Sequence, residues 1–139
     1  MKTHQYFFAG MLSLACFCAR AEFVVIVSAK APVSQLTSEQ ASQIFLGKLA
    51  TFPGGEQAIP LDLPDGTSIR NEFYEKLANK SPKQLMAYRA NRAFSGKGMP
   101  PKEITSALEL KKIVATNPNT VGYLEKSEVD GSVKVVLSP

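Results

Sequence analysis

The chain has 139 residues, with 16 lysine and arginine residues against 12 acidic ones and a formal net charge of +4. Its two cysteines, Cys16 and Cys18, and its one histidine, His4, all lie near the N-terminus. If processing removes that part, no thiol or imidazole remains, which excludes disulfides, cysteine or histidine catalysis, and zinc sites built from these residues.

The N-terminal segment has the pattern of a secretory signal peptide. Lys2 is followed by an apolar run, Tyr6 to Cys18, and by the small-x-small sequence Ala19-Arg20-Ala21. The run is shorter than the roughly 20 residues of a membrane-spanning helix. We predict a signal peptide over residues 1–21, one domain over residues 22–139, and a periplasmic location. A lipoprotein signal that ends at Cys16 is the alternative.

Strand and helix patterns alternate along the predicted domain. The β-branched run Glu22 to Ser28 predicts a buried strand. Thr37 and Gln40 have the spacing of a capping box, which predicts a helix that ends at Gly47. Ile59 to Leu63 predicts a second strand.

The turn after this second strand has the features of an anion site. Asp65-Gly66 is typical of a tight turn, and Thr67 or Ser68 is placed to cap the next helix. The N-terminus of a helix presents unpaired N–H groups and the positive end of the helix dipole, which attract anions. The candidate ligand-binding residues are therefore Asp65, Gly66, Thr67, Ser68 and Arg70. An ordinary capped turn that binds nothing is the alternative interpretation.

A further helix is predicted after this one. Ser81, Pro82 and Gln84 form a second capping-box pattern with proline at the first helical position. The apolar stripe of this helix consists of Met86, Ala90, Ala93 and Phe94, which predicts its buried side. The glycines and prolines of Ser95 to Pro101 predict a structured loop.

Basic residues are concentrated in one part of the chain. Between Lys76 and Lys102 there are seven basic residues and no acidic ones. Such an imbalance indicates an anionic partner, and we name Arg89, Arg92 and Lys97 as a candidate basic interaction face. A solvated helix face is the alternative.

The C-terminal part completes an α/β pattern. Ser106 and Glu109 predict a capping box for the last helix. Val121 to Leu124 and Ser132 to Leu137 predict short strands, joined through a turn at Asp130-Gly131. Strands that alternate with helices are typical of an α/β layer fold.

Three segments resemble a known family. Ile44-Phe45-Leu46-Gly47-Lys48 and Asn117-Pro118-Asn119-Thr120-Val121-Gly122-Tyr123 look like segments of the substrate-binding proteins of phosphate ABC transporters. Ala87 to Pro101 looks like the short, single-domain members of that superfamily. The resemblance implies a periplasmic-binding-protein type II fold, here as a single lobe, with a mixed sheet flanked by about four helices.

The resemblance also implies a ligand loop. In the family an arginine followed by Ser-Gly-Thr contributes phosphate ligands from the matching lobe. Thr67 falls on the serine position and Ser68 on the glycine position, whereas Leu63 replaces the arginine and Ile69 the threonine. Arg70 is the candidate replacement for the lost charge. A single lobe leaves the ligand half solvated, so we expect a Kd on the order of millimolar unless a partner closes the site.

The function expected from these features is that of an exported, non-enzymatic solute-binding module for phosphate or a similar oxyanion. The alternative is an interaction module with a decayed site, which docks an acidic envelope protein or anionic lipid headgroups through its basic segment. A second copy of the chain is the simplest partner. No acid–base pair supports catalysis, and no cofactor or metal is expected. Export and the modest charge argue against nucleic acid, and any membrane contact is expected to be peripheral.

Overall fold

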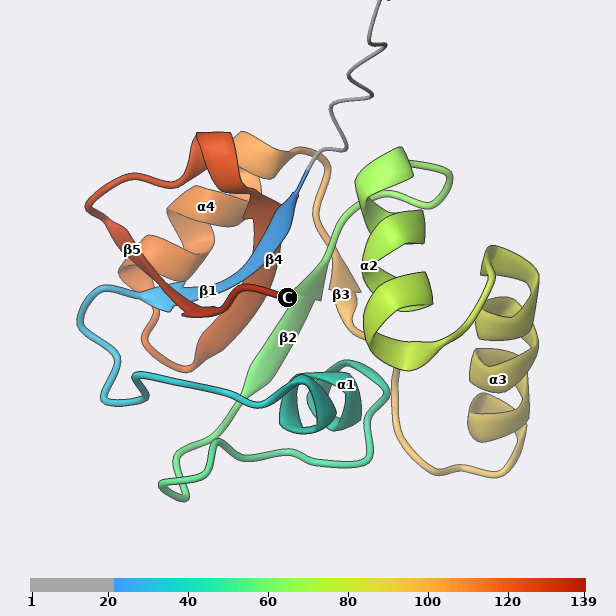
Figure 1. Ribbon diagram of the computed structural model, residues 1–139. Helices are drawn as coiled ribbons and strands as arrows, with labels where there is room; N and C mark the ends of the chain where they lie inside the picture. Colours follow the sequence, from blue (N-terminus) through green and yellow to red (C-terminus); the bar gives the residue numbers. More distant parts are fainter. Residues whose placement is uncertain (1–21) are drawn as a thin grey trace, which may run out of the picture.

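The computed structural model describes residues 22–139, which form one mixed sheet with helices packed on its faces (Figure 1). The sheet has the strand order β3-β2-β4-β1-β5. β1 pairs antiparallel with β4 and β5, whereas β2 pairs parallel with β3 and β4. The strands are β1 (Phe23–Ser28), β2 (Ile59–Asp62), β3 (Lys102–Glu103), β4 (Thr120–Glu125) and β5 (Val133–Leu137). The predicted α/β class with a mixed sheet is confirmed.

Within residues 22–139 four α-helices accompany the sheet, and most of them begin as predicted. Thr37 accepts a hydrogen bond from the Gln40 N–H, and Gln40 accepts one from the Thr37 N–H, so the first capping box is formed. Ser81 and Gln84 repeat the arrangement. The helices are α1 (Ser38–Phe45), α2 (Ser68–Ala78), α3 (Pro82–Phe94) and α4 (Ala107–Thr116), with a 3-10 turn η1 (Lys126–Glu128).

The start of α4 differs in one respect from its predicted form. Ser106 accepts a hydrogen bond from the Glu109 N–H at 3.2 Å, as a cap does. The Glu109 carboxylate does not accept a hydrogen bond from the Ser106 N–H, so α4 has a single cap and not the predicted capping box. The last two predicted strands are confirmed as β4 and β5.

The alternation of side chains along β4 shows which helices cover which face of the sheet. The Tyr123 ring stacks on Phe73 of α2 with 3.9 Å between ring centroids, and lies against Phe45 of α1. Gly122, the preceding residue, faces Leu110 and Val114 of α4. Successive residues of a strand point to opposite faces. Therefore α1 and α2 cover one face and α4 covers the other.

Gly122 gives a test of this packing. A Cβ atom added there would lie 2.6 Å from Cδ2 of Leu110 and 3.4 Å from Cγ2 of Val114. Overpacking of this kind costs about 1–3 kcal/mol. We expect Gly122→Ala to lower the free energy of unfolding by this amount in urea denaturation. Combined with Leu110→Ala, which by itself costs about 2–5 kcal/mol, it should give a loss smaller than the sum of the two single losses. Independent, additive losses would contradict the assigned contact.

Helix α3 lies at the edge of the molecule beside α2 (Figure 1). Leu85 is its one buried residue, whereas Met86 is 67% exposed and Phe94 is 97% exposed. The prediction that Met86, Ala90, Ala93 and Phe94 form the buried side was therefore wrong. The side that faces the body instead carries aromatic and guanidinium groups, which find hydrogen-bond partners there.

Candidate functional site

The turn between β2 and α2 leaves the start of the helix without a side-chain cap. Thr67 occupies the N-cap position with extended backbone angles, but its hydroxyl donates to the Pro64 carbonyl at 2.8 Å. Gly66 has a φ of +84°, which a tight turn requires and glycine adopts without strain. The first turn of α2 carries no acidic residue. The first N–H groups of a helix have no partner within it, and Ser68, at the start of α2, is exposed.

Arg70 does not extend toward this helix start. It is 8% exposed, and its Nη1 donates to the Leu63 carbonyl at 3.0 Å. The same nitrogen lies 3.4 Å from a carboxylate oxygen of Glu103 on β3, and Nε lies 3.9 Å from Asp62. The guanidinium is already paired with protein groups beneath the turn. The proposal that it supplies the positive charge missing at Leu63 finds no support in this placement.

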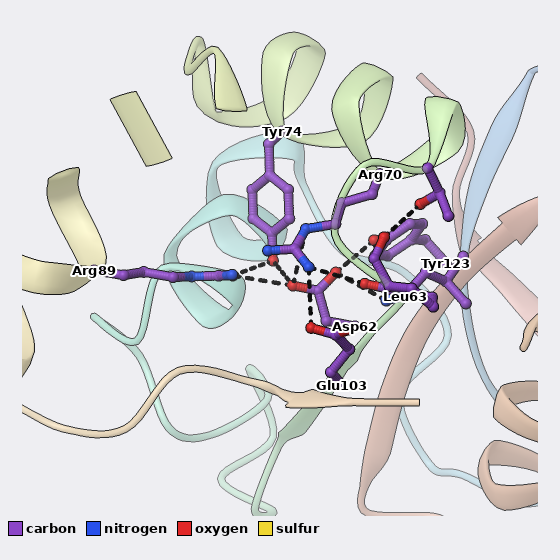
Figure 2. A network of polar contacts seen from close by, with 9 residues as sticks. Asp62, Leu63, Arg70, Tyr74, Arg89, Glu103 and Tyr123 are labelled. Carbon is purple, nitrogen blue, oxygen red and sulfur yellow. Dashed lines mark hydrogen bonds and ion pairs between the residues drawn. The ribbon is translucent and has the colours of Figure 1, made fainter. Parts of the chain in front are cut away.

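Arg70 belongs to a buried polar cluster centred on Asp62, the last residue of β2 (Figure 2). Asp62 is 1% exposed. Its Oδ1 accepts hydrogen bonds from the Tyr123 hydroxyl and the Leu63 N–H. Its Oδ2 accepts one from the Tyr74 hydroxyl at 2.7 Å and one from Arg89 at 3.1 Å. The carboxylate is thus satisfied on both oxygens, as a buried charge must be.

The two tyrosines of this cluster are held in their neutral form. Burial raises the pKa of Tyr74 well above its ordinary value, and the negative charge of Asp62 raises it further. The pKa of Tyr123 is likewise raised, first by burial and then by the negative charge of Asp62. Burial lowers the pKa of Arg89, but the charge of Asp62 and the hydrogen bonds to Asp62 and Tyr74 outweigh it, so the pKa is raised on balance. Both phenols are therefore proton donors to Asp62.

A surface groove of about 380 Å³ lies between the turn before α2 and helix α3. It is lined by Asp65, Arg70, Pro82, Lys83, Leu85, Met86 and Arg89. The positive charges here do not amount to a surplus, because Asp62 and Glu103 pair with Arg70, Asp62 also pairs with Arg89, and Asp65 stands at the rim.

The predicted basic face is dispersed by the fold. Arg89 points into the cluster around Asp62. Arg92 donates to the Gly47 carbonyl at 2.9 Å and to the Lys97 carbonyl at 2.6 Å, and lies over the Tyr88 ring. Of the three, only Lys97 is exposed; Arg89 and Arg92 are half-buried. Arg89 and Arg92 are not free for a partner because their planar guanidinium groups donate to carboxylate and carbonyl acceptors beneath α3.

The described part of the chain contains neither a metal-ligand group nor a membrane-spanning helix. Residues 22–139 contain no group of three or more histidine, cysteine or acidic side chains placed to hold a metal ion. Within the same residues no helix has the length and apolarity needed to cross a membrane. The predicted signal peptide and its lipoprotein alternative lie outside the described residues.

The cluster around Asp62 was missed by the sequence analysis. Its partners are 8 to 61 positions away along the chain, on α2, α3 and β4, and only the fold brings them together. One signal was present: Asp62 interrupts the apolar run from Ile59 to Leu63. A carboxylate inside a buried strand must find partners, so it predicts a polar network without saying which residues form it.

The fold resembles that of several solved substrate-binding proteins. The structure resembles a protein described as a phosphate ABC transporter substrate-binding protein from Clostridium perfringens, solved with bound phosphate, with a TM-score of 0.67 and 23% identity. It also resembles an ABC-type phosphate transport receptor from Vibrio cholerae (TM-score 0.65, 19% identity) and PstS from Borrelia burgdorferi (TM-score 0.61, 12% identity). No family model and no curated protein matches the sequence.

These matches cover 83% of this chain but only 44%, 45% and 46% of the three solved proteins. The chain thus spans less than half the length of the structures that it resembles. At this identity the likeness establishes the fold, and the resemblance predicted from the sequence is confirmed at that level. The roles of Asp65, Gly66, Thr67, Ser68 and Arg70 in ligand binding stay predictions.

Proposed function

We propose that this chain is a non-enzymatic solute-binding module that binds phosphate or a similar oxyanion at the N-terminus of α2. The observation that carries the proposal is the first turn of α2, which has neither a side-chain cap nor an acidic residue. It occurs in a chain whose fold matches part of proteins described as phosphate receptors, one of them solved with phosphate. Helix N-termini bind such anions through their N–H groups and dipole.

The proposed ligands are the backbone N–H groups after Thr67 together with the hydroxyl of Ser68. Ser68 is exposed and Thr67 is half-buried, so an anion can approach both. Gly66 and Asp65 shape the turn. Arg70 does not contact the anion in this proposal. Its hydrogen bond to the Leu63 carbonyl holds the end of β2 against α2. With no free guanidinium and with solvent on one side, the site is expected to bind weakly, with a Kd on the order of millimolar.

Calorimetry and thermal unfolding test the proposal directly. Phosphate at about tenfold its Kd should stabilise the fold by about 1.4 kcal/mol, which raises the melting temperature by several degrees. Sulfate should act similarly, and chloride at equal ionic strength should not. If tens of millimolar phosphate produce neither heat nor a rise in melting temperature, the proposal is wrong.

Ser68→Glu is the sharpest variant. A carboxylate in the first turn of α2 occupies the positive end of the dipole and repels an incoming anion, so phosphate affinity should fall about tenfold or more. The same charge favours the helix by about 0.3–1 kcal/mol, so the fold should be retained.

The matched control is Leu108→Glu, which adds the same charge to the first turn of α4, where Leu108 is 59% exposed. It should leave phosphate binding unchanged. Equal losses in the two variants would indicate a general charge effect and contradict a local site.

The proposed location is the periplasm, where such a module would bind its anion beside a transporter. This part of the proposal rests on the predicted signal peptide and on the description of the similar solved proteins as transport receptors. Fractionation of cells that express the full chain should place a product shortened by 21 residues in the periplasmic fraction. A full-length product in the cytoplasm would contradict it.

A further inference from the structure

The outward side of α3 is largely apolar and is not covered by any described part of the chain. Phe94 is 97% exposed and Met86 is 67% exposed, and the alanines between them, Ala87, Ala90 and Ala93, are exposed as well. Arg89 and Arg92 point into the molecule, whereas Lys83, Gln84 and Asn91 are exposed together with the apolar residues. An apolar face of this kind at the edge of a molecule marks an interaction surface.

Within this face, four residues form a straight stripe. Lys83, Ala87, Ala90 and Phe94 follow one another at steps of four, three and four residues, which places them on one line along the helix. All four are exposed. The middle of the stripe is small, and its two ends carry a cation and an aromatic ring.

This order makes the stripe complementary to a copy of itself. When two such helices pair antiparallel, Ala87 of each meets Ala90 of the other, and the small side chains let the backbones approach closely. Lys83 of each then meets Phe94 of the other, an arrangement in which the ammonium group lies against the ring face and the lysine stem covers the ring. Both contacts occur twice by symmetry. We propose that α3 is a homodimer interface, in which a second copy of this chain covers the stripe.

The charges around α3 favour a second copy over an anionic surface. Two of the basic residues in the segment from Lys76 to Lys102, Arg89 and Arg92, are paired with internal acceptors. Lys80 lies over the Tyr88 ring, 4.9 Å from its centroid. Lys83 is then the one charged group on the stripe itself, and the antiparallel pairing gives it an aromatic partner. A membrane-binding helix instead needs several cations along its polar edge.

Sedimentation of the full chain tests the proposal. A single helix pair is a small interface, so dimers should form with a Kd on the order of 10–100 µM. Ala90→Glu, which places a carboxylate at the centre of the pair, should weaken dimerisation about tenfold or more. Phe94→Ala should weaken it as well, because it removes the ring that Lys83 of the other copy contacts. Leu108→Glu, at an exposed apolar position on α4, should leave it unchanged.

Cross-linking tests the orientation. With Cys16 and Cys18 replaced by serine, the chain has no native thiol. A mixture of Lys83→Cys and Phe94→Cys chains should then be joined by a short bis-maleimide more efficiently than either variant alone. Faster joining within each variant alone would indicate a parallel pair and overturn the proposal.

Two further results would also overturn it. One is a wild-type chain that remains monomeric up to about 0.5 mM, well above the expected Kd. The other is a dimer that Ala90→Glu does not affect. If a monomeric chain instead binds vesicles of phosphatidylcholine and phosphatidylglycerol, and Phe94→Ala abolishes that binding, the face contacts lipid and not a second copy. Phosphate binding is measured separately, so its failure would leave this inference untouched.

Discussion

Asp62→Ala is expected to lower the free energy of unfolding by about 3–5 kcal/mol, the cost of removing one partner from a buried ion pair. The substitution leaves Arg89 half-buried without its carboxylate, and leaves the hydroxyls of Tyr74 and Tyr123 without an acceptor. Urea denaturation of the variant measures the change. Because typical domains are stable by only 5–15 kcal/mol, this is among the largest single effects that the fold can show.

Asp65→Ala is the matched control, because Asp65 is three residues away in the same segment and is exposed. It should change the stability by less than about 0.5 kcal/mol. A loss below about 1 kcal/mol in Asp62→Ala would mean that the cluster is hydrated and weakly coupled, and would contradict the arrangement in Figure 2.

The same substitution bears on the proposed site. Asp62 accepts the Leu63 N–H, and Arg70 donates to the Leu63 carbonyl, so the cluster fixes both polar groups of the residue that begins the turn. The first turn of α2 starts five residues later. A cluster that holds the strand end and the helix together orients the N–H groups that the anion would contact. Asp62 and Arg70 thus fix the geometry of the proposed anion site and do not supply a free charge to it.

Local patterns were sufficient to predict most of the fold. The capping boxes at Thr37 and Ser81 located the starts of α1 and α3, because a cap depends on residues only three positions apart. The apolar strands were found because β1 and β4 are buried along nearly their whole length. The short strand β3 was not predicted, since its two exposed charged residues carry no strand signal and depend on pairing with β2.

The sides of α3 could not be predicted from its own sequence. Periodicity showed that Met86, Ala90 and Phe94 share a face but could not show what covers it. The sequence pattern predicted that Arg89 and Arg92 face solvent. Their acceptors could not be foreseen, because Asp62 lies 27 positions from Arg89 and Gly47 lies 45 positions from Arg92. A helix that docks through arginines and leaves its apolar side exposed reverses the usual rule. That reversal is what suggests a partner for α3.

Above pH 10 the free energy of unfolding should fall more steeply with pH than the titration of exposed groups alone would cause. Tyr74 and Tyr123 both have pKa values raised above the ordinary 10.0, by burial first and by Asp62 second. Above pH 10 the unfolded chain loses these two protons while the folded chain keeps them. The unfolded state then binds fewer protons, so stability falls as the pH rises, by up to about 1.4 kcal/mol per pH unit for each tyrosine.

Urea denaturation at several pH values between about 8 and 11.5 measures this slope. Tyr74→Phe removes one of the two groups, so it should lower the stability near neutral pH and roughly halve the slope above pH 10. Below pH 10 the two tyrosines should contribute no pH dependence, because they keep their protons in both states. A slope that is unchanged in Tyr74→Phe would show that the phenols are open to solvent. In that case Asp62 could not be the buried acceptor that holds β2 against α2.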